Sequence, residues 1–251
     1  MSMLSLMGHI AQQKFSALTT RQVKPTRTAT PLGLHQGSAA DAPILAITMA
    51  RLDGAILTMP KEKMSVVSVG VTTVAGYPVF RSYLSDGVSF FQIVADPHDR
   101  TKALEVKFFS IHSETVPDGV QMGGLLGTPG RKDSEGNVVV SAEDPLIGWP
   151  QFQLDGPPPV LYERTWKAGT TPVDPEIHEE SIYSADGTVT TIRHRAMEYG
   201  RTLGSGSTVT SEFLLATVIE SKSPAGDDEA AFDVFLGVDV VISDLKVLAA
   251  A

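Results

Sequence analysis

Apolar and polar residues alternate along most of the chain, from about residue 44 to residue 241. Residues 65–74 alternate Val with Ser and Thr, which is the period of a strand that buries one face. Aromatic and β-branched residues fill residues 77–84 and 88–95, and Asp86-Gly87 between them is typical of a β-hairpin turn. The pattern therefore predicts a mainly β protein whose strands pair antiparallel.

Two further Asp-Gly pairs divide apolar runs in the same way. Asp53-Gly54 follows the apolar residues 44–50, and Asp186-Gly187 separates two runs that mix charged and β-branched residues. Each pair predicts a hairpin, and residues 44–50 are accordingly expected to form a strand. At the N-terminus, apolar residues recur at three- and four-residue steps over residues 1–20, which predicts a short amphipathic helix.

Glycine and proline accumulate in the middle of the chain and interrupt the strand pattern. This distribution predicts two antiparallel β-sheet halves, arranged as a meander, a sandwich or a half-barrel, with a Gly/Pro-rich connector between them. The predicted parts are residues 1–30 (N-terminal helix and linker), 31–112 (first β half), 113–157 (connector) and 158–251 (second β half and tail).

Seven aromatic residues gather in the first half and allow two interpretations. They could line a ligand groove, or they could form the core of that half, which is the simpler interpretation because aromatic residues suit a pleated, buried surface. The residues are Tyr77, Phe80, Tyr83, Phe90, Phe91, Phe108 and Phe109.

Composition narrows the classes of function. The chain has 251 residues, of which 42% are apolar, and it contains no cysteine, which excludes disulfides, thiolate metal sites and a cysteine nucleophile. The net charge of −9 disfavours nucleic acid and anionic lipid as partners. No run of about 20 apolar residues predicts membrane insertion, and the N-terminus does not resemble a secretory signal. The expected location is the cytoplasm.

The histidines offer the one metal-binding candidate. His178 and Glu180 share a face of a predicted strand, and His194 on the next strand could supply a third ligand. The favoured alternative is a solvent-facing ladder of opposite charges that stabilises the sheet. In that ladder, three residues of one strand face two arginines of the next: Glu176, His178 and Glu180 against Arg193 and Arg195.

No catalytic residue and no cofactor site emerge from the remaining motifs. Gly124, Gly127 and Gly130 have no strand before them and no helix after them, so they do not predict a phosphate loop. No nucleophile elbow is present either. The sequence therefore favours a protein that is not an enzyme.

Several segments resemble the YjfK-like proteins, a bacterial family of unknown function. The similar segments span residues 31–242 and are residues 31–34, 80–93, 104–109, 146–156, 162–166, 193–203, 211–221 and 232–240. The family has no assigned catalytic residues, so the resemblance transfers none. It implies a bacterial protein encoded near phage-shock-type membrane-stress proteins, a small membrane protein and an ATP-grasp ligase.

Three functions are consistent with this pattern, and the least favoured is a structural subunit that assembles through edge strands. The first is a cytoplasmic, non-enzymatic accessory protein that binds another protein, for instance in a membrane-stress response, because sheet edges and loops are natural docking surfaces. The alternative is an enzyme or a small-ligand binder with its site between the two β halves.

Overall fold

The computed structural model describes residues 28, 30–126, 131–132, 138–139, 146–204, 211–222 and 228–248. Strand accounts for 53% of the structure, and the described residues form two short α-helices, α2 (Ile44–Leu52) and α3 (Gly119–Leu126). The mainly β prediction is therefore confirmed. The helix expected over residues 1–20 lies outside the described residues.

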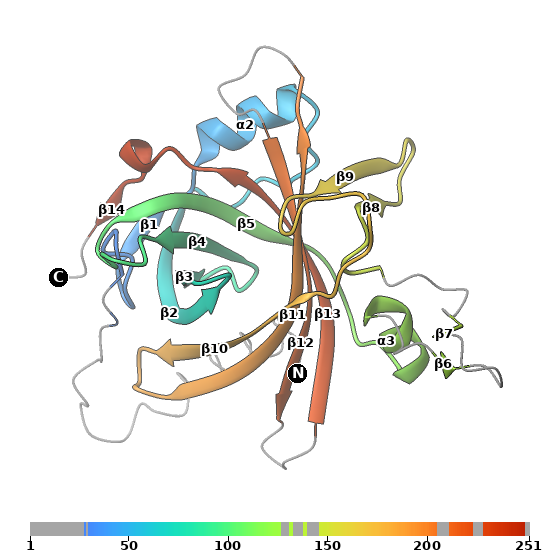
Figure 1. The fold of residues 1–251 in the computed structure, drawn as a ribbon. Helices are drawn as coiled ribbons and strands as arrows, with labels where there is room; N and C mark the ends of the chain where they lie inside the picture. The colour runs from blue at the N-terminus through green and yellow to red at the C-terminus, as the bar shows by residue number, and fades with distance from the viewer. Residues whose placement is uncertain are drawn as a thin grey trace.

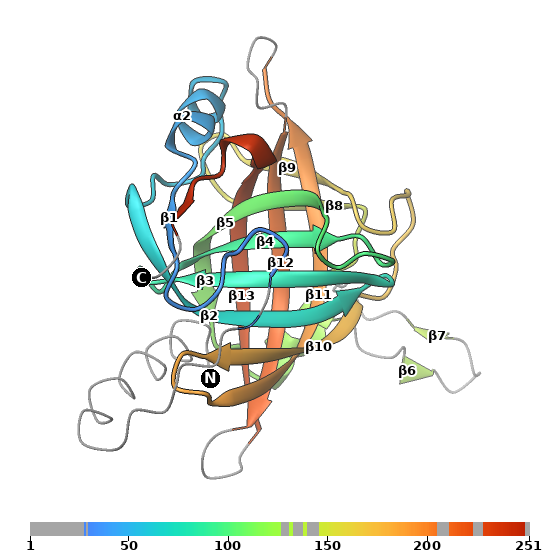
Figure 2. The ribbon, with the colours of Figure 1, turned by 90° about the vertical axis from the view of Figure 1, so that its left-hand side faces the viewer.

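Eight antiparallel strands close into a barrel (Figures 1 and 2). Their order around the ring is β2-β3-β4-β5-β13-β12-β11-β10, and β10 returns to β2. The strands are β2 (Lys63–Val74), β3 (Tyr77–Leu84), β4 (Ser89–Ala95), β5 (Ala103–Thr115), β10 (Glu176–Ser184), β11 (Val189–Thr202), β12 (Ser211–Lys222) and β13 (Asp228–Asp239).

The prediction of two separate sheet halves is wrong, because strands from both halves pair at two seams. β5 pairs with β13, where Phe109 lies opposite Gly237, and β2 pairs with β10, where Gly70 lies opposite Ile182. Two open sheets would each leave edge strands with unpaired backbone N–H and C=O groups. Closing the ring pairs those groups, and the space between the expected halves becomes the interior of one barrel.

Tight turns set the register of the hairpins in the ring. The predicted turns at Asp86-Gly87 and Asp186-Gly187 are confirmed, and both glycines have positive φ, of 77° and 88°. A third turn joins β2 to β3 through Ala75 and Gly76, with φ of 50° and 86°. Two consecutive residues with positive φ match the turn type whose twist suits a two-residue hairpin.

Residues 44–50 are not a strand, because Ile44–Leu52 forms helix α2. Ile47 and Ala50 lie three residues apart on its buried face, which is helical spacing. The short apolar run is therefore compatible with a helix as well as with a strand. Asp53 is the C-cap and Gly54 has a φ of 96°, with its N–H donated to the carbonyl oxygen of Arg51. The Asp-Gly pair therefore ends a helix here instead of turning a hairpin.

The barrel wall is buried on both faces over much of its surface. Phe90 and Phe109 meet inside the barrel, with ring centroids 5.4 Å apart, whereas the next pair, Phe91 and Phe108, meets outside at 5.3 Å. Helix α2 and the hairpin of β8 (Gln151–Leu154) and β9 (Val160–Arg164) contribute to the outer cluster. Six of the seven predicted core aromatics are buried, and Tyr77 is the exception at 46% exposure.

Short elements complete the fold. They are β1 (Ala39–Asp41) and β14 (Val247–Leu248), which extend the sheet beside β2, the separate pair β6 (Arg131–Lys132) and β7 (Val138–Val139), and the 3₁₀ helix η1 (Ile242–Asp244). The predicted connector, residues 113–157, starts as the end of β5 and contains α3, β6, β7 and β8. In the described part of the chain, no helix has the length and apolar character needed to cross a membrane.

Candidate functional site

The inward face of the barrel carries ionisable side chains as well as apolar ones. Arg81 of β3 contacts Glu180 of β10, and Lys107 of β5 contacts Glu198 of β11, although neither pair of strands is adjacent in the sheet. These contacts therefore cross the interior. The apolar part of the same face is a separate cluster of Tyr83, Phe90, Phe109, Ile182, Ile192, Ala196, Leu215, Ile219 and Phe235.

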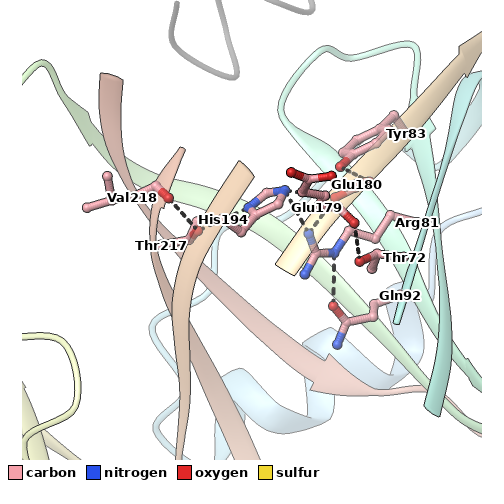
Figure 3. A network of polar contacts seen from close by, with 9 residues as sticks. All are labelled: Thr72, Arg81, Tyr83, Gln92, Glu179, Glu180, His194, Thr217 and Val218. Carbon is pink, nitrogen blue, oxygen red and sulfur yellow. Dashed lines mark hydrogen bonds and ion pairs between the residues drawn. The ribbon is translucent and has the colours of Figure 1, made fainter. Parts of the chain in front are cut away.

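Glu180 is the centre of a polar network that also contains Arg81, Tyr83 and His194 (Figure 3). Its carboxylate accepts hydrogen bonds from Arg81 Nη1 at 2.6 Å and from Tyr83 Oη at 2.6 Å, and it lies 2.9 Å from His194 Nε2. The side chain is fully buried, and Gly70 on β2 makes room for it. A Cβ atom at position 70 would overlap Glu180 Oε1, so glycine is required for this placement.

Charge and hydrogen bonds keep Glu180 ionised although it is buried. Burial raises the pKa of a carboxyl group, but Arg81 and the bonds from His194 and Tyr83 outweigh it and bring the pKa of Glu180 to about 2. Burial lowers the pKa of His194, so its imidazole is neutral at pH 7. Since Glu180 can only accept, His194 Nε2 carries the hydrogen, and Nδ1, 3.1 Å from Thr217 Oγ1, accepts.

His178 lies against His194 with the two rings stacked, 4.9 Å between centroids and 14° between planes. It is 7% exposed, and neither ring nitrogen has a hydrogen-bond partner among the described residues. Burial, and then the positive charge of Arg81, lowers the pKa of His178 to about 2. His178 is therefore a neutral ring packed inside the barrel.

The structure thus brings the three metal candidates, His178, Glu180 and His194, into one cluster. The described residues nevertheless contain no group of three or more His, Cys, Asp or Glu side chains arranged to hold a metal ion. Arg81 and Tyr83 occupy the Glu180 carboxylate instead.

The solvent-facing ladder is also not what the structure shows. His178 lies opposite His194 and Glu180 opposite Ile192, all on the inward face. Arg193 and Arg195 flank His194 on β11 and therefore face outward, where both contact Glu220 of β12. The ladder assumed an apolar interior, whereas this barrel places charges inside.

A cavity of about 500 Å³ opens at the end of the barrel where β2 ends and β3 begins. This end, with the β9–β10 connection beside it, is called the mouth below. The volume lies within the range of small-molecule sites. Its wall combines apolar and aromatic residues (Val74, Ala75, Tyr77, Val79, Val94, Trp166 and Phe213) with polar ones (Gln92, Glu105, Lys107, Thr165, Lys167, Glu176, Glu198 and Asp239).

Lys107 and Glu198 form the buried polar centre of the mouth. Lys107 Nζ lies 2.8 Å from Glu198 Oε1, 2.9 Å from Glu105 Oε1, and 3.9 Å from the centre of the Phe213 ring. Glu198 is 2% exposed, and its second oxygen, Oε2, has no hydrogen-bond partner among the described residues. Burial raises the pKa of Glu198 although Lys107 opposes the shift.

Gln92 connects the polar residues of the mouth to the network around Glu180. Its side chain lines the mouth, and its Oε1 accepts a hydrogen bond from Arg81 Nε at 3.1 Å. Arg81 Nη2 has no partner within the described structure. A polar path therefore runs from the mouth through Gln92 and Arg81 to Glu180.

A third buried carboxylate, Glu212, lies on the outer face of the wall. Oε1 accepts from the backbone N–H groups of Ile56 and Leu57, at 2.8 and 2.9 Å. Oε2 accepts from Tyr162 Oη at 2.9 Å and from Arg201 at 2.7 and 2.9 Å. Both oxygens are occupied, so this carboxylate ties the chain after α2 and strand β9 to the barrel.

A second hollow, of about 750 Å³, lies outside the barrel between α2 and η1. It is larger than the mouth, but none of the described residues that line it has a buried side-chain nitrogen or oxygen without a partner. Leu45 on its wall is 75% exposed. The mouth is therefore the better candidate of the two, because its wall includes a buried carboxylate with an oxygen that has no partner among the described residues.

Sequence reasoning missed Arg81, Lys107 and Glu198. A signal was available for Arg81 and Lys107, because each is a charged residue next to apolar and aromatic residues in a run that reads as strand. A buried strand carries an ionised residue only where that residue has a partner, so two such residues on separate strands indicate polar partners in the interior. Glu198 lies among charged residues and gave no such signal. Of the aromatics proposed for a groove, Tyr77 lines the mouth.

A family model described as "Protein of unknown function (DUF2491)" matches residues 14–246, which is most of the chain. Neither the curated proteins nor the solved structures include a significant match.

Proposed function

The chain belongs to the DUF2491 family of proteins of unknown function, and we propose from its barrel that it binds a small molecule in the mouth. This proposal moves the ligand site expected between two sheet halves into the interior of a single barrel. The mouths of β-barrels are among the places where small-molecule sites commonly occur.

The observation that carries the proposal is a cavity of about 500 Å³ whose wall includes Glu198, a buried carboxylate with one oxygen, Oε2, that has no partner among the described residues. Leaving a buried polar atom without a partner costs about 1–3 kcal/mol, so such atoms are rare unless water or a ligand satisfies them. A bound molecule with a hydrogen-bond donor would recover this cost once the buried carboxylate turns toward the cavity. The cavity gives that molecule the necessary room.

The remaining wall suits a molecule with an apolar body. Val79 and Val94 offer aliphatic surface, while Tyr77, Trp166 and Phe213 offer aromatic rings. Burial of apolar surface contributes roughly 25 cal/mol per Å², so such a wall supplies affinity while the few polar groups fix orientation.

Binding of the neutral dye Nile red, followed by its fluorescence, tests the proposal. We expect saturable binding of one dye per barrel to the wild type. Val79→Trp, which fills a cavity position that is 3% exposed, should weaken binding by about tenfold or more. Val189→Trp, at a position that is 53% exposed and not part of the cavity wall, should leave it unchanged.

Val94→Trp at the partly buried part of the wall repeats the test if Val79→Trp does not fold. The proposal fails if the dye does not bind the folded wild type. It also fails if a folded cavity variant binds the dye as well as the wild type does.

The YjfK-like assignment remains a prediction, and so does the role of a cytoplasmic accessory protein that binds another protein in a bacterial membrane-stress system. Their support is the resemblance over residues 31–242. Co-purification of the chain with the phage-shock-type proteins would test the role, and the absence of any association would count against it.

A further inference from the structure

We infer that the ligand of the mouth is an organic cation, an ammonium group on an apolar body, with its nitrogen at Glu198 and its body against the aromatic wall. This inference rests on the proposed binding function and names the class of ligand.

Charge is the first argument. Four carboxylates line the mouth, against two ammonium groups, so the wall has a formal excess of two negative charges. The acidic residues are Glu105, Glu176, Glu198 and Asp239, and the basic ones are Lys107 and Lys167. Arg81 behind the wall does not offset the excess, because Glu180 pairs with it at 2.6 Å. A cation entering the cavity is attracted, whereas a carboxylate or phosphate is repelled.

The two lysines are already occupied. Lys107 lies between Glu198 and Glu105, at 2.8 and 2.9 Å, and Lys167 lies 3.0 Å from Glu176. An anionic ligand would have to displace these carboxylates to reach either ammonium group. An ammonium ligand would displace no carboxylate, because Glu198 lines the cavity and its Oε2 has no partner in the described part of the chain. Oε2 is itself buried, so the carboxylate must turn toward the cavity for the ammonium group to reach it.

The aromatic residues of the wall form the second argument. Lys107 already places its ammonium group 3.9 Å from the centre of the Phe213 ring. Tyr77 and Trp166 are two further aromatic residues in the wall of the same cavity. Aromatic faces attract ammonium groups and the polarised CH₂ groups beside them, by roughly 0.5–2 kcal/mol for each well-placed ring. An amine with a short carbon chain matches both features.

Three six-carbon probes of equal size distinguish the ligand classes by displacement of Nile red: hexylammonium, hexanol and hexanoate. Hexylammonium should displace the dye at a concentration about 10- to 100-fold below that of hexanol, which is the usual effect of one charge-assisted hydrogen bond. Hexanoate should be the weakest of the three.

Variants locate the effect. Glu198→Gln should abolish most of the preference for hexylammonium over hexanol. Asp239→Asn, at the exposed rim of the mouth, should reduce the preference by a few-fold and repeats the test if Glu198→Gln does not fold. Glu163→Gln, an exposed acid on β9 outside the cavity wall, removes the same charge and should have no effect.

Each contrary result has a distinct meaning. Stronger displacement by hexanoate, or equal displacement by hexanol and hexylammonium, would overturn the cation inference and leave the binding function intact. Dye that binds but is not displaced by hexylammonium would do the same. The absence of any dye binding to the mouth would overturn both proposals.

Discussion

Glu198 and Glu212 lie on the neighbouring strands β11 and β12, and each is buried beside a cation, yet they have different surroundings. Glu212 faces outward, and both of its oxygens are occupied by donors. Glu198 faces inward to a cavity, and one of its oxygens has no partner among the described residues. The first carboxylate holds parts of the protein together, whereas the second borders the cavity in which we propose that a ligand binds.

The contrast has a physical origin in the wall of the barrel. Side chains alternate between the two faces, so neighbouring strands send similar residues to different surroundings. Outside, the chain after α2 and strand β9 fold over Glu212 and provide fixed donors. Inside, Glu198 borders the cavity. Among the described residues, Lys107 from the opposite wall and Thr165 both contact its Oε1, at 2.8 and 3.0 Å.

The largest expected effect is on the outer network. Glu212→Gln removes the charge that Arg201 faces and puts an amide where five donor groups converge. We expect a loss of about 3 kcal/mol in the free energy of unfolding, at the lower end for a broken buried ion pair because Arg201 is 21% exposed. The melting temperature should fall by roughly 6–12 °C.

Differential scanning calorimetry measures this change, and Glu220→Gln is the matched control. Glu220 is 30% exposed and pairs with Arg195 on the outer surface, so its loss should cost at most about 1 kcal/mol. Equal effects of the two substitutions would remove the distinction between the Glu212 network and an ordinary surface pair.

Gly70→Ala tests the inner network at its tightest point. The new Cβ would overlap Glu180 Oε1, so the carboxylate must move away from Arg81 and Tyr83. We expect a loss of about 1–3 kcal/mol, measured by urea unfolding. Gly119→Ala, where a Cβ meets nothing within 4 Å, should be close to neutral. A stable Gly70→Ala protein would show that Glu180 is not confined as described.

The stacked histidines predict a smaller effect that depends on pH. The pKa of His178 is lowered by burial to about 2, so the unfolded chain binds a proton near pH 6.5 and the folded chain does not. Stability should therefore fall as the pH drops below about 6.5. His178→Phe removes one proton-binding group from the unfolded chain. The substitution should therefore reduce the loss of unfolding free energy by about 1.4 kcal/mol per pH unit.

Urea unfolding at about pH 7.5 and pH 5 measures the difference. Over the roughly 1.5 pH units below 6.5, the wild type should lose about 2 kcal/mol more than His178→Phe does. Equal losses would mean that His178 is protonated inside the barrel or is open to solvent.

These regions also show which features the sequence could reveal. Alternation in residues 65–74 and the turn at Asp86-Gly87 depend on neighbours along the chain, so the strands and two hairpins were predictable. Closure of the barrel was not, because β5 meets β13 and β2 meets β10 across more than a hundred residues. The pair Asp53-Gly54 misled because the same positive φ that turns a hairpin also ends a helix.

The candidate site was predictable only in part. His178, Glu180 and His194 were recognised as neighbours from their spacing, but their face was misassigned because a polar barrel interior was not considered. The partners of these residues come from distant strands, and pairing such as Lys107 with Glu198 follows from the diameter of the closed ring. A single sequence contains no local signal for that distance.

One displacement experiment on Glu198→Gln and Glu212→Gln, at a temperature where both are folded, tests the central distinction most directly. The account predicts that Glu198→Gln reduces the preference for hexylammonium over hexanol by about tenfold or more, while Glu212→Gln leaves it within about twofold of the wild type. Equal preferences in the two variants, whether both changed or both intact, would contradict it.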